Sequence, residues 1–124
     1  NIKVEWRGNK NNKDILKEYA SGLYDLFINT SSSEGIPVSI MEAISAGIPV
    51  IATDVGGTRE IIIDELNGSL LPADVSTEQI SKMIIKYINM DNETYQTISN
   101  NARTVWEKLF NSDNNYKQFV SEIF

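Results

Sequence analysis

Two glutamates, Glu34 and Glu42, lie in a segment whose residue types and order suit the binding of a phosphorylated ligand. Glu34 follows the apolar run 26–28, which predicts a loop at the carboxyl end of a parallel strand, where open α/β sheets bind ligands. Gly35 allows the backbone to approach a ligand closely. A helix predicted to begin at Pro37 would direct free N–H groups and its positive dipole end toward the same crevice, which favours a phosphate there.

Glu42 is predicted inside that helix. Ile40 and Ile44 mark its apolar face, whereas Ser39, Glu42 and Ala46 share another face. A carboxylate buried among small residues needs a polar partner. The vicinal hydroxyls of a ribose suit it, because one carboxylate accepts two hydrogen bonds from a diol. A phosphate at the helix start and a ribose at Glu42 together describe a nucleotide site.

Each acid also has a purely structural interpretation. Glu34 could stabilise the helix by placing a negative charge near the positive end of its dipole, and Glu42 could be a solvated helix residue. The spacing of two acids is by itself a weak signal, so the nucleotide hypothesis depends on the residues that surround them.

Composition excludes several other classes of function. The 124 residues contain no Cys and no His, which excludes disulfide scaffolds, zinc sites built on those residues, and catalytic triads that need histidine. Seventeen acidic against eleven basic residues give a net charge of −6, which argues against a nucleic-acid partner. No apolar run approaches the roughly 20 residues that span a bilayer, and the start does not resemble a signal peptide. We therefore expect a cytoplasmic protein.

The hydrophobic pattern alternates between strand and helix periods along the chain. Strands are predicted at residues 2–6, 26–28, 49–53 and 68–71, and helices at 13–21, 37–46, 59–63, 76–88 and 92–110, with a further amphipathic segment at 116–124. This order is typical of parallel βαβ units with right-handed crossovers. The fold class is therefore α/β: a Rossmann-like parallel sheet flanked by helices, with a helical C-terminal cap.

The residues around the two acids extend into a longer pattern. It reads S-E-G-x-P-x4-E-A-x3-G-x-P-V-I-A-T-D-V-G-G-x-x-E-I-I, beginning at Ser33. This pattern resembles the nucleotide-sugar site of retaining glycosyltransferases with the GT-B fold, the group often called family 4 or glycosyl transferases group 1. The resemblance runs from about Val4 to Arg103, where Asn101-Ala102-Arg103 is similar to that family's late helix signature.

The resemblance implies a role for each acid. Glu42 would accept the ribose hydroxyls of a nucleoside diphosphate sugar. Glu34 would be the catalytic residue and would contact hydroxyls of the donor sugar ring near its reacting end.

It also implies donor contacts from the backbone. Amides around Gly35, Ile36 and Val38 would hold the sugar and the diphosphate, whereas Pro37 has no N–H to contribute. Thr53, at the end of the next predicted strand, is expected to border the same cleft and to bind the donor.

The implied reaction is transfer of a hexose or N-acetylhexosamine with retention of anomeric configuration. The acceptor would be a polysaccharide, an O-antigen or a lipid-linked glycan. A UDP-sugar is the preferred donor, with GDP- and ADP-sugars left open. The resemblance also implies that the departing phosphate assists the acceptor on the same face, and that neither a metal ion nor another cofactor is required.

The chain departs from the family in length. The resemblance covers residues 1–124 only as a single partial nucleotide-sugar-binding domain. The resemblance implies that the domain that binds the acceptor, and the first two βα units with the Arg and Lys that neutralise the diphosphate, are not among these residues. Arg7, Lys10 and Lys13 stand near the wrong strand, and Arg59 is interpreted as a helix-surface charge. We expect this chain to be inactive alone, and the parent protein's contact with the cytoplasmic membrane face stays open.

The absent strands would leave a buried strand without partners, which is unfavourable in water. Two outcomes are expected. Residues 2–6 could pair directly with 26–28 to give a compact four-stranded parallel sheet. Alternatively, two chains could pair edge to edge as a homodimer.

Two other classes of function compete with a glycosyltransferase. A non-catalytic GT-B-like interaction or nucleotide-binding module would keep the fold without the chemistry, but retention of both Glu34 and Glu42 argues against it. A Rossmann-type cofactor binder would need a G-x-G-x-x-G fingerprint, which the sequence lacks.

Overall fold

The computed structural model describes residues 3–8, 10–33, 35 and 37–111. Three parallel strands form one sheet, in the order β1-β2-β3. The strands are β1 (Phe27–Asn29), β2 (Val50–Thr53) and β3 (Gly68–Leu71), and the helices are α1 (Asn12–Ala20), α2 (Val38–Ser45), α3 (Thr58–Ile61), α4 (Thr77–Ile88) and α5 (Asn92–Asn111). The α/β class and the flanking helices expected from the sequence are confirmed.

The central strand, β2, is buried along its whole length. Its Val50 lies opposite Phe27 of β1 and opposite Gly68 of β3. A Cβ added at Gly68 would come within 2.2 Å of the Val50 carbonyl oxygen, so the close approach of β3 to β2 requires glycine at this position. Burial on both faces explains why the strand is a continuous apolar run rather than an alternating one.

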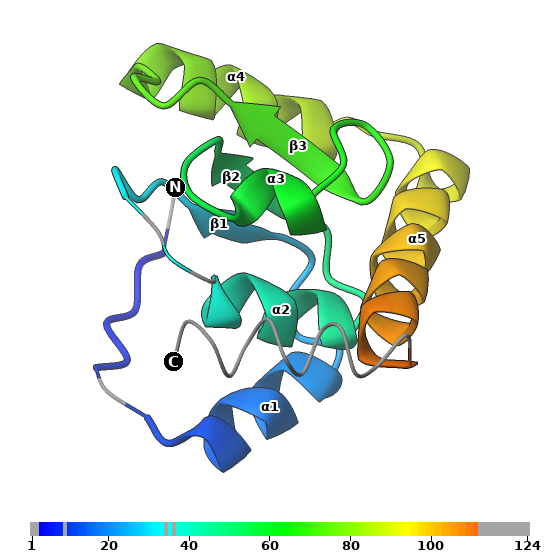
Figure 1. The fold of residues 1–124 in the computed structure, drawn as a ribbon. Coiled ribbons are helices and arrows are strands. Elements are labelled where there is room, and N and C mark those ends of the chain that lie inside the picture. Colours follow the sequence, from blue (N-terminus) through cyan, green and yellow to red (C-terminus); the bar gives the residue numbers. More distant parts are fainter. Residues whose placement is uncertain (1–2, 9, 34, 36, 112–124) are drawn as a thin grey trace.

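Helices cover the sheet on both faces, with α4 on one side and α1, α2 and α3 on the other (Figure 1). Successive β2 residues point to opposite faces, so Val50 and Ala52 pack with Ile40 and Ile44 of α2, whereas Ile51 packs toward α4. The long helix α5 closes the molecule by packing against α2 and contributes residues to both clusters. The helices on the two faces of the sheet thus fix the strands from which the loops at its carboxyl edge begin.

The expected fourth strand is absent from the described residues. Lys3–Gly8 has no regular secondary structure, so the prediction of a four-stranded sheet is wrong within this part of the chain. Val4 and Trp6, which produced the alternating pattern, are 69% and 94% exposed. A strand is stabilised by a paired neighbour and a buried face, and this segment has neither here.

The predicted helix boundaries are mostly confirmed. α1 begins one residue earlier than expected, because Asn11 rather than Asn12 is the N-cap, and its side chain accepts the Asp14 N–H at 2.9 Å. Gly47 follows α2 with φ +74°, the left-handed conformation that commonly ends a helix. The predicted segment 116–124 lies outside the described residues. Among the helices described, none is both long and apolar enough to cross a membrane.

Candidate functional site

The start of α2 leaves its polar groups available. Pro37 is the N-cap and forms no side-chain cap hydrogen bond, and the first turn contains no acidic residue. The first backbone bond of this helix joins the Met41 N–H to the Pro37 carbonyl at 3.1 Å. The N–H groups of Val38 and Ser39 therefore have no partner within the helix, and they add to the positive end of its dipole. This terminus can accept an anion.

The loop that leads from β1 to α2 is anchored to the neighbouring connection. The Thr53 hydroxyl, at the end of β2, donates to the Ser31 carbonyl at 2.6 Å. The Gly57 N–H, in the turn before α3, donates to the Gly35 carbonyl at 3.2 Å. Since β1 and β2 are parallel, both contacts lie at the carboxyl edge of the sheet, where such folds bind ligands (Figure 1).

Glu42 lies one turn further along α2 and is partly buried. It lines a groove of about 340 Å³ together with Leu16 of α1, Met41 of α2 and Trp106 of α5. Within the described residues, its carboxylate forms no hydrogen bond or ion pair, and burial raises its pKa. A half-buried acid without a partner can accept the hydroxyls of a ligand.

Arg103 lines the same groove but already has partners. Its guanidinium lies 4.6 Å from the centre of the Trp106 ring, and its Nε donates to Glu107 at 2.9 Å. It also donates to the Ser45 carbonyl. The side chain is therefore held against α2 and α5 by contacts within the protein.

The described members of the predicted site come together at one end of the molecule. Gly35 is exposed, Val38 is exposed in the first turn of α2, and Thr53 is buried with its hydroxyl bonded to the loop. The predicted Glu34 and Ile36 lie outside the described residues. The donor contacts of all these residues stay predictions, and for Thr53 the structure adds a partner within the protein.

Arg59 is a surface charge, as the sequence indicated. Its guanidinium donates to both carboxylate oxygens of Asp54, at 3.0 and 2.6 Å, and this contact holds the pKa of Asp54 below its ordinary value. Arg59 is therefore engaged beside the Gly56–Gly57 turn.

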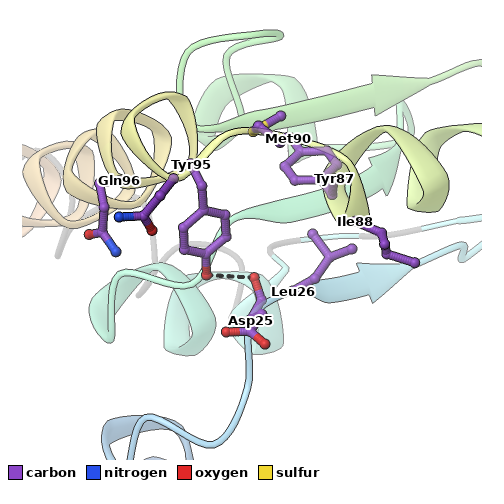
Figure 2. Close-up of a pocket in the computed structure, with 8 residues that line it drawn as sticks. Asp25, Leu26, Tyr87, Ile88, Met90, Tyr95 and Gln96 are labelled. Carbon is purple, nitrogen blue, oxygen red and sulfur yellow. Dashed lines mark hydrogen bonds between the residues drawn. The ribbon is translucent and has the colours of Figure 1, made fainter.

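A second cavity, of about 490 Å³, lies away from this site (Figure 2). It is lined by Leu26, which precedes β1, and by residues where α4 meets α5, including Tyr87, Ile88 and Met90. The Tyr95 hydroxyl donates to the Asp25 carbonyl at 2.7 Å at its edge. Because Leu26 precedes β1, this cavity is at the amino edge of the sheet. Cavity size therefore does not identify the predicted nucleotide site.

The contacts that hold the β1–α2 loop were not predicted from the sequence. Gly57, in the turn before α3, bonds directly to Gly35, a contact that was not among the sequence predictions. The predicted strand 26–28 does not include Asn29, which ends β1 and accepts hydrogen bonds from Ser31. Neither contact could be predicted from the sequence, because Gly, Asn and Ser occur in many local structures.

Comparison with known proteins identifies the family. The family model described as "Glycosyl transferases group 1" matches residues 1–105. A curated relative, the GtfA subunit of a UDP-N-acetylglucosamine–peptide N-acetylglucosaminyltransferase from Streptococcus agalactiae, is 34% identical over 88 residues, covering 68% of this chain. The chain spans only 16% of that relative's length.

Solved structures share the fold. The C-terminal domain of the group 1 glycosyl transferase LpcC from Francisella tularensis has a TM-score of 0.69 at 26% identity, covering 85% of this chain and 51% of that domain. Anabaena Alr3699/HepE, solved in complex with UDP-glucose, has a TM-score of 0.69 at 28% identity, covering 88% of this chain and 29% of HepE. Since the family match extends over most of the sequence, the chain belongs to the group 1 glycosyltransferases and has the fold of their C-terminal domain.

Proposed function

We propose that this chain is the donor-binding portion of a retaining glycosyltransferase that uses a UDP-sugar. The transferred group would be a hexose or N-acetylhexosamine, and the acceptor a polysaccharide, an O-antigen or a lipid-linked glycan. The observation that carries the proposal is the partly buried carboxylate of Glu42, one turn from the start of α2, which forms no hydrogen bond or ion pair within the part of the chain that the structure describes. The complex of HepE with UDP-glucose supports uridine as the nucleoside of the donor.

Each proposed contact follows from the chemistry of one part of the donor. Glu42 accepts the two ribose hydroxyls, and the amides around Gly35, Ile36 and Val38 donate to the diphosphate and the sugar. Glu34 contacts the sugar hydroxyls near the reacting carbon and is the proposed catalytic residue. Thr53 borders this loop, and its hydroxyl hydrogen is already donated to Ser31.

In the proposed reaction the bond from the anomeric carbon to the diphosphate oxygen breaks, and a bond to the acceptor hydroxyl oxygen forms on the same face. The acceptor proton passes to the departing phosphate. The N–H groups and the dipole at the start of α2 stabilise the negative charge that develops on the leaving group. We propose that no divalent metal ion takes part.

The proposal that this chain by itself is inactive is supported by the share of its relatives that it spans. It covers 51% of the LpcC domain and 29% of HepE. A transferase must also position its acceptor, so the portion present here would bind the donor without transferring it. Sugar transfer to an added glycan by this chain, with the product identified by mass spectrometry, would contradict this part of the proposal.

Titration calorimetry with UDP, GDP and ADP tests the proposal. We expect UDP to bind most tightly, and Glu42→Gln to weaken it by about tenfold to a hundredfold, because hydrogen bonds to a charged group contribute about 1.5–3 kcal/mol. Glu78→Gln is the matched control, since it removes the same charge from an exposed position on α4. Absence of nucleotide binding, or equal affinities of the two variants, would contradict the proposed site.

A further inference from the structure

Ser31, in the loop after β1, is held from two neighbouring strands. The Oδ1 atom of Asn29, the last residue of β1, accepts the Ser31 N–H at 3.0 Å and the Ser31 hydroxyl at 2.6 Å. The hydroxyl of Thr53, the last residue of β2, donates to the Ser31 carbonyl at 2.6 Å. Both polar groups of the Ser31 backbone are therefore satisfied by side chains at the carboxyl ends of adjacent strands.

The Thr53 contact begins where the backbone ladder ends. The pairing of β1 with β2 stops at Asn29 opposite Ala52, whereas β2 continues for one residue, with Thr53 opposite Leu71 of β3. The side chain of Thr53 thus replaces the next backbone link to the chain leaving β1. Thr53 is 2% exposed, so solvent competes little for this hydrogen bond.

A second contact holds the same loop further along. The Gly57 N–H donates to the Gly35 carbonyl, and a Cβ at Gly57 would lie 3.1 Å from that oxygen. Thr53 and Gly57 both belong to the segment from β2 to α3, and their acceptors, Ser31 and Gly35, bracket residues 32–34. Ser31 and Gly35 are therefore both held by groups on the neighbouring strand and turn.

We propose that Thr53 is a positioning residue for the donor: through Ser31 it holds the chain that leaves β1 toward α2, whose amides are proposed to bind the diphosphate. This inference rests on the proposed function and deepens it. Glu42 belongs to α2, which packs through Ile40 and Ile44, so its position does not depend on the Thr53 hydroxyl. Loss of that hydroxyl should weaken binding of the diphosphate and leave binding of the nucleoside nearly intact.

The test compares UDP with UMP on Thr53→Val and Thr53→Ser. Valine keeps the branched shape in β2 but cannot donate, whereas serine restores the donor. We expect Thr53→Val to bind UDP about tenfold more weakly and UMP within about twofold of the unchanged chain. Thr53→Ser should bind both within about twofold, and urea unfolding should find all three chains folded. Equal losses for UDP and UMP, or no loss, would overturn the inference.

A nucleotide-free measurement separates this inference from the proposed function. Backbone order parameters of Ser32, Ser33 and Gly35 should fall in Thr53→Val and recover in Thr53→Ser, with those of α2 unchanged. Unaltered order parameters would overturn the positioning role even if UDP binds. Failure of the unchanged chain to bind UDP, with loop order lost as expected, would instead overturn the proposed function and the assignment to the donor.

Discussion

The N-termini of α2 and α4 differ in how their first N–H groups are capped. At α4 the Ser76 hydroxyl accepts the Gln79 N–H at 3.1 Å, and the Gln79 side chain accepts the Ser76 N–H at 2.9 Å. At α2 the N-cap is Pro37, which forms no side-chain cap hydrogen bond, and the first turn has no acid. The start of α4 is therefore capped by its own residues, whereas among the described residues no side chain caps the start of α2.

The two helix starts therefore serve different purposes: the cap of α4 stabilises the fold, whereas the start of α2 can bind an anion. A capping side chain contributes about 1 kcal/mol, which α2 forgoes. Burial stabilises α2 instead, since Ile40, Ala43 and Ile44 are fully buried. A helix held by its core face can leave its start uncapped, and a dipole end with free N–H groups then stabilises an anionic ligand.

The largest expected effect comes from giving α2 an acid in its first turn. Ser39→Asp should reduce UDP affinity by about tenfold or more, because a fixed negative charge repels the diphosphate. The same change should raise the free energy of unfolding by about 0.3–1 kcal/mol, because it complements the dipole. Calorimetry and urea unfolding measure the two quantities. Ser39→Asn is the uncharged control. Normal UDP binding by Ser39→Asp would mean that the start of α2 is not part of the binding site.

The converse change at α4 should affect stability alone. Ser76→Ala removes the capping box and should lower the free energy of unfolding by about 1 kcal/mol, with UDP affinity unchanged. Thermal or urea unfolding checks the first part, and calorimetry the second. Ser81→Ala, an exposed position within α4, is the matched control and should leave both quantities nearly unchanged. A loss of UDP affinity in Ser76→Ala would mean that α4 contributes to the binding site.

The smallest effect is the pH dependence from Glu42. Burial raises the pKa of this acid, so its contribution to stability is present when it is protonated and is lost as the pH rises through its folded-state pKa. The stability of Glu42→Gln relative to the unchanged chain should therefore increase as the pH rises from about 4 to neutrality. Urea unfolding across that range measures it. A stability difference between Glu42→Gln and the unchanged chain that does not vary with pH would contradict the raised pKa of Glu42.

Much of this comparison could be predicted from the sequence, because it depends on local chemistry. Proline before α2, Gly47 after it and the spacing of Ile80 and Ile84 in α4 all act within a few residues. The run 49–53 likewise predicted a buried strand, which β2 confirms.

The remaining features depend on long-range contacts. Val4 and Trp6 alternate like strand residues, but alternation does not supply a pairing partner, and the described segment stays exposed. The bond from Thr53 to Ser31 joins residues 22 positions apart, and many serines and threonines could form such a bond. Local pattern therefore predicts where a nucleotide site would lie, and that prediction is still to be tested. The contacts that shape the loop after β1 required the fold.

Amide chemical shifts of the isotope-labelled chain, recorded during titration with UDP, test most directly whether the start of α2 is the nucleotide site. We predict the largest shifts in Gly35, Val38, Ser39 and Glu42, little change in Thr77–Gln79 at the start of α4, and loss of the response in Glu42→Gln. Largest shifts around Leu26, Tyr87 and Tyr95, at the opposite edge of the sheet, or a spectrum unchanged by UDP, would contradict the account.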